Sequence, residues 1–263
     1  MILKTKELND RNITKGEQFQ RSRLLEKDCF DNFPTCVWII GLGGIGGHVA
    51  EMLGSIESIE KIVLFDDDIV ELSNLGRTCY RYEHLDIPKV SAASEIITGR
   101  NTSIEVIPIN QRFDEDMSIT IIEDEVLRDK LIKTYHKTLI IDCRDNFYND
   151  YKFFKNIFNR SHDSFKLIRA AYDGMSVTLD PNPENNPVWS NTGGGYVQAP
   201  SHSIPSRLAA LLIITLYGII SWENDSNVAE YSDKFPGPYT FDLWKLMEFI
   251  RDGVNSLNES ENI

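Results

Sequence analysis

The sequence predicts an α/β fold in which helices cover both faces of a doubly wound, mainly parallel sheet. Three observations favour this fold. Short apolar runs of strand length alternate with longer segments whose apolar residues recur at helical spacing. A cluster of glycines joins the first strand to the first helix, and an acidic residue follows the second strand. The chain has 263 residues, enough for one large domain with a substantial core.

The first half of the chain supplies three predicted strands and the helices between them. The strands are expected at 37–40, 62–65 and 103–109. One helix is expected directly after the glycines and a second at 89–98, just behind Pro88. Apolar residues at helical spacing within 114–135 predict a third helix.

The second half of the chain continues the alternation of strands and helices and then contains a predicted loop and a long apolar helix. We expect a buried strand at 138–141, a helix rich in aromatic residues at 147–158, and two strands at 167–171 and 175–179 joined by a turn. Residues 181–195 are rich in Pro, Asn and Gly and predict a mobile loop. A strongly apolar helix is expected after Pro205.

The composition excludes several classes of protein. A formal net charge of −13 argues against a general nucleic-acid or anionic-membrane surface. The four cysteines form no CxxC pair, so neither a zinc knuckle nor a disulfide framework is predicted. The N-terminus lacks the apolar run of a signal peptide, and the longest apolar segment, 208–222, is too short to cross a bilayer. We therefore expect a cytoplasmic protein without nucleic-acid or membrane partners.

The glycine cluster and the second strand together predict a nucleotide site. Gly41, Gly43, Gly44 and Gly46 lie between the first strand and the first helix. Glycines let the backbone approach a phosphate, and a helix N-terminus offers free N–H groups. Asp66 ends the second strand 20 residues after Gly46, the spacing at which a carboxylate binds ribose hydroxyls.

Two cations after Asp66 favour ATP chemistry over hydride transfer. Arg77 and Lys89 follow the acidic cluster 66–68. Asp67 and Asp68 are expected to form a solvated turn rather than a metal site, and Asp68 could also hold Arg77 in place. A nicotinamide dehydrogenase needs no such pair, whereas an enzyme that expels pyrophosphate from ATP needs positive charge on the departing phosphates. The pattern GxxxxGK[ST] is absent, so a P-loop is not predicted.

The ordered motifs GLGGIGG, FDDDIVELSNLGR, PKV and DCRDN resemble those of the ThiF/MoeB family. These proteins are activating enzymes for ubiquitin-like sulfur-carrier proteins and are related to the adenylation domains of ubiquitin-activating enzymes. The resemblance runs from about residue 21 to about residue 222. It implies a Rossmann-like fold with an N-terminal helical arm (1–35), an adenylation domain (36–250) and a frayed tail (251–263).

The resemblance also implies a role for each matching residue. Asp145 would bind Mg²⁺ near the α-phosphate, although an aspartate there also suits the N-cap of the next helix. Arg21 would reach into the active site of a partner subunit, which implies a homodimer. Residues 195–200 would face the substrate. The residues implied in ATP binding are Gly41, Gly43, Gly44, Gly46 and Asp66, and those that would contact the phosphates are Asn74, Arg77 and Lys89.

The implied reaction is attack of a C-terminal carboxylate on the α-phosphate of ATP. The carboxylate belongs to a small ubiquitin-like protein or a peptide, and the products are an acyl-adenylate and pyrophosphate. The protein supplies orientation and electrostatic stabilisation rather than a covalent nucleophile.

Several departures from the family pattern narrow this expectation. The zinc-binding CxxC pairs are missing, and the crossover region 179–195 has no cysteine to accept the activated carrier. Asp150 and Thr78 stand where the family commonly has arginine and glutamine. We therefore expect no thioester relay, and the peptide-adenylating branch of the family stays open. A nucleotide-binding scaffold without catalysis and a nicotinamide-dependent oxidoreductase remain the alternatives.

Other polar residues near these motifs are expected to be structural. Asp142 is predicted to order the end of its strand, and His48 to have a packing or surface role. Cys36 and Cys143 are expected to be core thiols. Cys79 is expected near the phosphates but without a covalent role.

Overall fold

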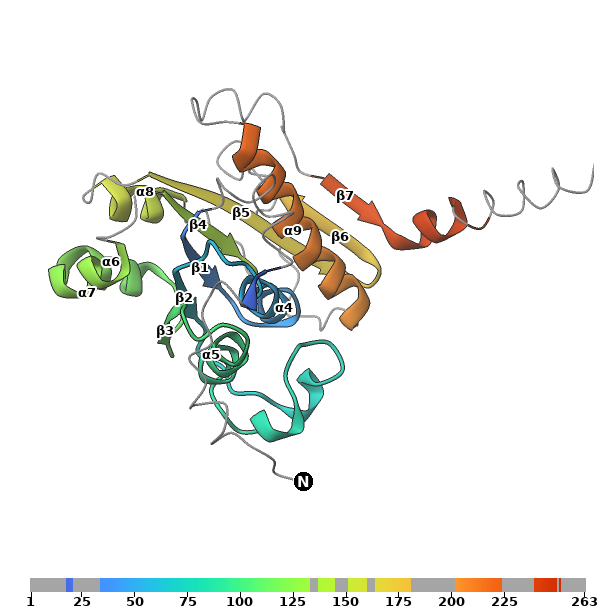
Figure 1. Ribbon diagram of the computed structural model, residues 1–263, viewed down its shortest axis with the longest axis horizontal. Helices are drawn as coiled ribbons and strands as arrows, with labels where there is room; N and C mark the ends of the chain where they lie inside the picture. Colours follow the sequence, from blue (N-terminus) through green and yellow to red (C-terminus); the bar gives the residue numbers. More distant parts are fainter. Residues whose placement is uncertain are drawn as a thin grey trace, which may run out of the picture.

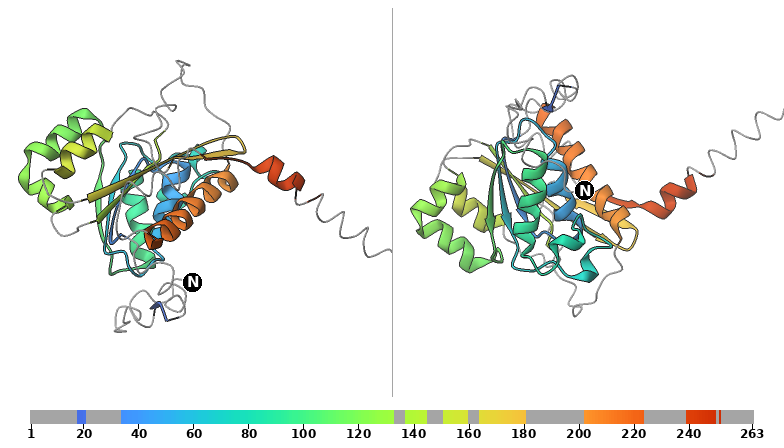
Figure 2. Two further views of the ribbon diagram at one scale, coloured as in Figure 1. Left: turned by 90° about the horizontal axis from the view of Figure 1, so that it is seen from above. Right: turned by 60° about the horizontal axis from the view of Figure 1, so that its bottom comes forward.

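The computed structural model describes residues 18–20, 34–132, 137–144, 151–159, 164–180, 202–223, 239–249 and 251. Over these residues the chain forms a seven-stranded sheet with helices on both faces (Figures 1 and 2). The strand order is β3-β2-β1-β4-β5-β6-β7. The predicted Rossmann-like α/β fold is thereby confirmed.

The described elements follow the predicted alternation. The strands are β1 (Cys36–Ile40), β2 (Lys61–Phe65), β3 (Glu105–Ile109), β4 (Lys137–Asp142), β5 (Ser164–Asp173), β6 (Ser176–Asp180) and β7 (Tyr239–Asp242). The α-helices are α4 (Gly44–Leu53), α5 (Lys89–Arg100), α6 (Glu115–Glu123), α7 (Glu125–Ile132), α8 (Tyr151–Asn159) and α9 (Ser203–Glu223). Two 3-10 helices, η1 (Leu72–Asn74) and η2 (Tyr82–His84), lie between β2 and α5.

The direction of the strands determines where a ligand can bind. Strands β1 to β5 run parallel, and β6 and β7 are antiparallel to their neighbours. From β1 the chain first adds β2 and β3 on one side and then β4 and β5 on the other. Ligands of such sheets bind in the crevice at the carboxyl ends where this order reverses. Ile40 pairs with both Phe65 and Asp142, so the residues that follow these three strands meet at that edge.

The central strand β1 is buried on both faces, which explains its uninterrupted apolar sequence. Its side chains alternate between two hydrophobic cores. Val37 and Ile39 belong to the core beneath α4, α5 and α9, whereas Trp38 and Ile40 belong to the core beneath α6, α7 and α8. The two helical layers lie on opposite sides of the sheet in the left view of Figure 2.

The connection from β1 to α4 requires glycine at two positions. Gly41 has a φ of +84°, a conformation that residues with a side chain rarely adopt. A Cβ atom on Gly46 would lie 1.9 Å from the Gly41 carbonyl oxygen. The first turn of α4 therefore packs directly on the backbone that leaves β1.

The predicted helix over 114–135 is two helices, because a capping residue interrupts it. Asp114 caps α6 by accepting a hydrogen bond from the Met117 N–H at 2.9 Å. Asp124 accepts from the Leu127 N–H at 2.9 Å and so begins α7. Ile119 and Val126 are 43% and 79% exposed, so they are not part of the core.

Other boundaries differ from the sequence expectation in smaller ways. Helix α9 begins at Ser203, so Pro205 lies inside its first turn, where no backbone N–H is required. Strand β7 was not predicted; it is a short strand at the edge of the described sheet, where it pairs with β6. The loop at 181–195, most of the helical arm (1–35) and nearly all of the tail (251–263) lie outside the described residues.

The close contact of Gly46 makes a testable prediction about stability. Gly46→Ala should lower the free energy of unfolding by about 2 kcal/mol or more, because the backbone at Gly41 must move to admit a methyl group. Urea unfolding followed by circular dichroism measures the change.

The matched control is Gly99→Ala in α5, where an added Cβ would meet nothing within 4 Å. This variant should gain about 0.5–1 kcal/mol from helix propensity. Equal unfolding midpoints for the two variants would contradict the inference that the Gly41 carbonyl leaves no room for a side chain at position 46.

Candidate nucleotide-binding site

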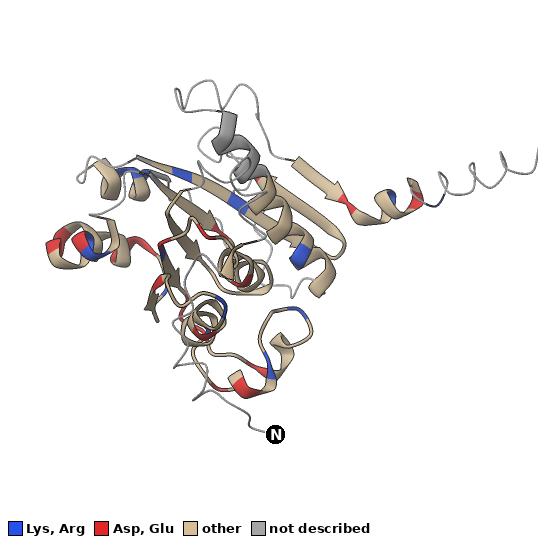
Figure 3. Ribbon diagram, viewed as in Figure 1, with Lys and Arg blue, Asp and Glu red and all other residues tan. Residues whose placement is uncertain are grey.

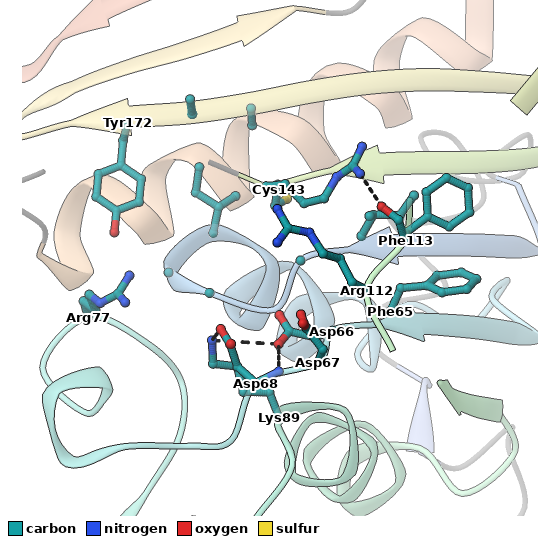
Figure 4. A pocket seen from close by; sticks show the side chains of 18 residues that line it. Phe65, Asp66, Asp67, Asp68, Arg77, Lys89, Arg112, Phe113, Cys143 and Tyr172 are labelled. Carbon is teal, nitrogen blue, oxygen red and sulfur yellow. Dashed lines mark hydrogen bonds and ion pairs between the residues drawn. The ribbon is translucent and has the colours of Figure 1, made fainter. Parts of the chain in front are cut away.

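A cavity of about 290 Å³ opens at the carboxyl edge of the sheet, where the strand order reverses. Figure 4 shows side chains entering it from the ends of several strands and from the segment that precedes α5. Its lining combines backbone of the glycine turn, three consecutive aspartates and several cations. The polar and glycine lining residues are Gly41, Gly43, Gly44, Asp66, Asp67, Asp68, Arg77, Lys89, Arg112, Arg144 and Tyr172.

The glycine turn presents backbone to this cavity. Helix α4 begins at Gly44, and no side chain caps its N-terminus. A Cβ on Gly43 would meet nothing within 4 Å, so this residue borders open space. The first N–H groups of a helix lack partners within the helix and carry partial positive charge. The start of α4 can therefore bind an anion such as a phosphate.

Asp66 is held rigidly at the end of β2. One carboxylate oxygen accepts a hydrogen bond from the Leu42 N–H at 2.6 Å, and the other accepts from the Asp68 N–H at 2.9 Å. Burial raises the pKa of the Asp66 carboxyl above its ordinary value, although nearby Lys89 acts in the opposite direction. Each oxygen keeps a further acceptor position, so the group can bind hydroxyls beside the glycine turn.

Lys89 shares its charge with the acidic cluster. It is the first residue of α5, and only 5% of it is exposed. Its ammonium lies 2.6 Å from an Asp68 oxygen and 3.9 Å from an Asp66 oxygen. Asp68 was expected to hold Arg77; that expectation was wrong, because the ion pair of Asp68 is with Lys89. Arg77 is half-buried and reaches the cavity from the segment after η1 (Figure 4).

A buried charge network lies at the end of β4, and its Arg144 lines the cavity. Asp142 is fully buried and accepts two hydrogen bonds from the Arg144 guanidinium, at 2.9 and 2.8 Å. The Arg169 guanidinium, on β5, lies 3.5 Å from the same carboxylate; Figure 3 shows the basic residues of this strand. Arg144 also donates to the Phe113 carbonyl at 2.6 Å. Asp142 therefore orders its strand end, as predicted, by joining β4, β5 and the loop before α6.

Six of the predicted site residues line the cavity, and two others that the structure describes do not. The six that line it are Gly41, Gly43, Gly44, Asp66, Arg77 and Lys89. Gly46 is not part of the lining and packs on the backbone of the turn. Asn74 is buried and caps η1, since its side-chain amide oxygen Oδ1 accepts a hydrogen bond from the Glu71 N–H at 3.1 Å. Arg21 and Asp145 lie outside the described residues.

Sequence reasoning gave no site role to several lining residues, among them Arg112, Phe113, Arg144 and Tyr172. Arg144 lies within the motif DCRDN and could have been found, because residues just after a central strand reach the carboxyl edge. The loop after β3 carries Arg112 and Phe113 but no recognisable motif. Tyr172 lies near the end of β5, and its hydroxyl would be 2.6 Å from a Cβ on Gly44.

The three described cysteines differ in position. Cys36 is buried as predicted, whereas Cys143 is partly buried: it packs against the core beneath α4, α5 and α9 and also lines the cavity. Cys79 lies outside the cavity lining beside Gly47, and burial raises its pKa to about 12. His48 is buried in α4, 3.5 Å from a Glu51 carboxylate oxygen, as expected for a packing role.

Removing the carboxylate that the two arginines share should destabilise the fold. Asp142→Ala should lower the free energy of unfolding by about 3 kcal/mol, because Arg144 and Arg169 both lose a buried anionic partner. Chemical denaturation of both proteins at neutral pH measures the difference.

A suitable control is Glu83→Ala, which removes an ion pair with Arg81 in which both side chains are more than 60% exposed. Such a pair contributes little, so the control should unfold like the unchanged chain. If Asp142→Ala behaved like this control, the buried network would not contribute to stability.

Among the helices that the structure describes, none has both the length and the apolar character needed to cross a membrane.

Known proteins resemble this chain in sequence and in fold. Ubiquitin-like modifier-activating enzyme 5 of Dictyostelium discoideum is 32% identical over 111 residues, which is 42% of this chain and 29% of that protein. The sulfur carrier protein ThiS adenylyltransferase of Escherichia coli is 31% identical over 144 residues, 53% of this chain and 51% of the relative. The chain thus spans between about a quarter and half of the length of these curated relatives.

Solved structures show the same fold at lower identity. The crystal structure of E. coli MccB superposes with a TM-score of 0.57 and 18% identity, over 79% of this chain and 64% of that one. PaaA gives a TM-score of 0.57 at 18% identity, over 86% and 72%. The model of the ThiF family matches residues 26–201, which include β1 to β6 and the whole lining of the cavity. The chain therefore belongs to the ThiF family.

Proposed function

We propose that the protein is an ATP-dependent adenylyltransferase that activates the C-terminal carboxylate of a small ubiquitin-like protein or a peptide. One observation carries the proposal. A single cavity holds an uncapped glycine-rich helix N-terminus, a fixed carboxylate and two cations, Arg77 and Lys89. These are the groups needed to bind a nucleoside triphosphate and to stabilise departing pyrophosphate.

The position of each group indicates how the nucleotide would lie. Phosphate oxygens would accept hydrogen bonds from the N–H groups at the start of α4, where Gly43 borders open space. The ribose hydroxyls would donate to Asp66, whose two backbone hydrogen bonds already fix the carboxylate. The nucleotide would thus cross the sheet edge from β1 to β2.

Arg77 and Lys89 would stabilise the charge that develops on the β- and γ-phosphates. The side chain of Asp68 is 66% exposed, so its pairing with Lys89 lies at the rim of the cavity. A phosphate oxygen could replace this carboxylate without leaving a buried charge unpaired. Cations preorganised in this way favour the transition state, in which negative charge on the leaving group is greatest.

The reaction itself needs no covalent nucleophile from the protein. A carboxylate oxygen of the substrate forms a bond to the α-phosphorus of ATP. The bond from this phosphorus to the bridging oxygen breaks, and pyrophosphate leaves with the electron pair. The protein contributes by holding the reacting groups in line and by excluding water.

Metal and subunit contributions are further parts of the proposal. Carboxylate oxygens suit Mg²⁺, which would neutralise phosphate charge, and we assign it to Asp145 after β4. Asp66, Asp67 and Asp68 place their oxygens within 4.8 Å of one another. However, Asp66 already accepts hydrogen bonds from two N–H groups and Asp68 pairs with Lys89, so these three carboxylates are less suited to bind Mg²⁺.

We propose that Arg21 comes from the partner of a homodimer, as the family resemblance implies.

The domain division and the location in the cell are also proposed. We propose a helical arm (1–35), an adenylation domain (36–250) and a tail (251–263); the family match, residues 26–201, begins within the proposed arm and covers most of the proposed adenylation domain. The three described cysteines are free thiols, which is usual for the cytoplasm. The net charge of −13 does not favour nucleic acid or an anionic membrane as a partner.

The relatives support two classes of substrate. The E. coli relative is named for the sulfur carrier protein ThiS, and the Dictyostelium relative for a ubiquitin-like modifier. E. coli MccB has been solved with ATP and, separately, with MccA and AMPCPP. We therefore propose a flexible C-terminus as the shared feature of the substrate, whether it belongs to a small protein or to a peptide.

Two experiments test the proposal against its alternatives. Calorimetric titration should show binding of ATP and not of NAD⁺, which would exclude the oxidoreductase. Exchange of pyrophosphate into ATP should require a carboxylate substrate, which would exclude a scaffold without catalysis. Binding of ATP with no exchange for any ubiquitin-like protein or peptide would favour the scaffold instead.

Loss of either cation should reduce catalysis more than ATP binding. Arg77→Ala and Lys89→Ala should each slow pyrophosphate exchange by about 100-fold or more, since each removes a charge from the leaving group. Asp145→Ala should abolish exchange with the fold intact. Exchange kinetics with circular dichroism as a folding check measure these effects, and unchanged rates in both cation variants would refute the proposed site.

Cys79→Ser should leave the exchange rate near that of the unchanged chain. With its pKa raised to about 12, this thiol stays protonated and unreactive at neutral pH. If the serine variant were inactive in the same assay, a covalent relay through Cys79 would have to be considered.

A further inference from the structure

The loop between β3 and α6 places a third arginine in the cavity, for which the proposed chemistry has no use. We propose that Arg112 covers the purine base of the bound nucleotide and stacks its planar guanidinium on the ring. This inference rests on the proposed ATP site and assigns a residue that favours a nucleotide over a polyphosphate without a base.

The backbone around Arg112 is anchored, whereas its side chain is not. The ring of Phe113 is buried, stacks on Phe154 at 4.9 Å and meets Phe65 edge-on at 5.2 Å. The Phe113 carbonyl accepts a hydrogen bond from Arg144, and Asp114 caps α6. The Arg112 side chain is exposed, and within the described chain its guanidinium has no hydrogen-bond or ion-pair partner.

The order of the strands places this arginine where the base must lie. The phosphates would bind at the end of β1 and the ribose at Asp66, at the end of β2. The next strand on that side is β3, and Arg112 follows it by only a few residues. Figure 4 shows Arg112 apart from Arg77, with its guanidinium beside Cys143.

The surroundings favour a flat aromatic ligand over another phosphate. Phe65, Phe113 and Cys143 provide apolar lining on this side of the cavity. A guanidinium stacks well on aromatic faces, which a lysine ammonium does not reproduce. An adjoining hollow of about 400 Å³ shares Asp67 and Arg112 with the cavity, so the arginine has room to move aside when a base enters.

The experiment compares ATP with inorganic triphosphate, which has no base. Dissociation constants for ATP, and for inorganic triphosphate in competition with it, are measured for the unchanged chain, Arg112→Ala and Arg112→Lys. We expect Arg112→Ala to weaken ATP binding by about tenfold, the magnitude of one base-stacking contact. Affinity for inorganic triphosphate should not change, and Arg112→Lys should not restore the affinity for ATP.

The outcomes separate this inference from the proposed function. Weaker binding of both ligands, restored by lysine, would assign Arg112 to the phosphates and overturn the stacking role, as would normal ATP binding by Arg112→Ala. Failure of the unchanged chain to bind ATP would overturn the proposed function itself. Arg81→Ala is the matched control, because Arg81 is exposed outside the cavity lining and its loss should change neither affinity.

Discussion

The close contact between Gly46 and the Gly41 carbonyl determines where the rest of the site can lie. A Cβ at Gly46 would be 1.9 Å from that oxygen, so α4 starts as near to β1 as two backbones allow. This approach directs the uncapped N-terminus of α4 into the crevice between β1 and β4. It also brings the Leu42 N–H to Asp66, which fixes the carboxylate at the end of β2. The proposed phosphate position and the proposed ribose position therefore both depend on one backbone contact.

The charges around this contact are organised in two ways. At the end of β4, Asp142 is fully buried and joins two arginines, so it connects strands and a loop rather than facing a ligand. At the rim, Lys89 pairs with a mostly exposed Asp68 and can exchange this partner for a phosphate at little cost. Buried pairs thus hold the shape of the cavity, and exposed pairs leave charge available for binding.

Several site residues could be predicted because short-range patterns specify them. The glycine turn, Asp66, Arg77 and Lys89 line one cavity as expected, since each follows a strand or begins a helix that the sequence reveals. Asn74 and Asp68 had other roles than expected: Asn74 closes η1, and Asp68 pairs with Lys89. Their partners depend on how the segment between β2 and α5 folds back, which no local pattern encodes. The helix predicted over 114–135 is divided at Asp124, because the Asp124 side chain caps α7 there. The apolar spacing along this segment is continuous and gave no sign of the break.

The sequence by itself determined the alternation of strands and helices from β1 to β6, the mainly parallel sheet and the position of the candidate site at its carboxyl edge. These features follow from local periodicity, from glycine spacing and from the rule that parallel strands share one functional edge. Only the tertiary structure decided that Arg112, Arg144 and Tyr172 join that site, because they come from β3, β4 and β5 regions far apart in the chain. Strand register and side-chain packing bring such residues together, and neither can be read from spacing along the sequence.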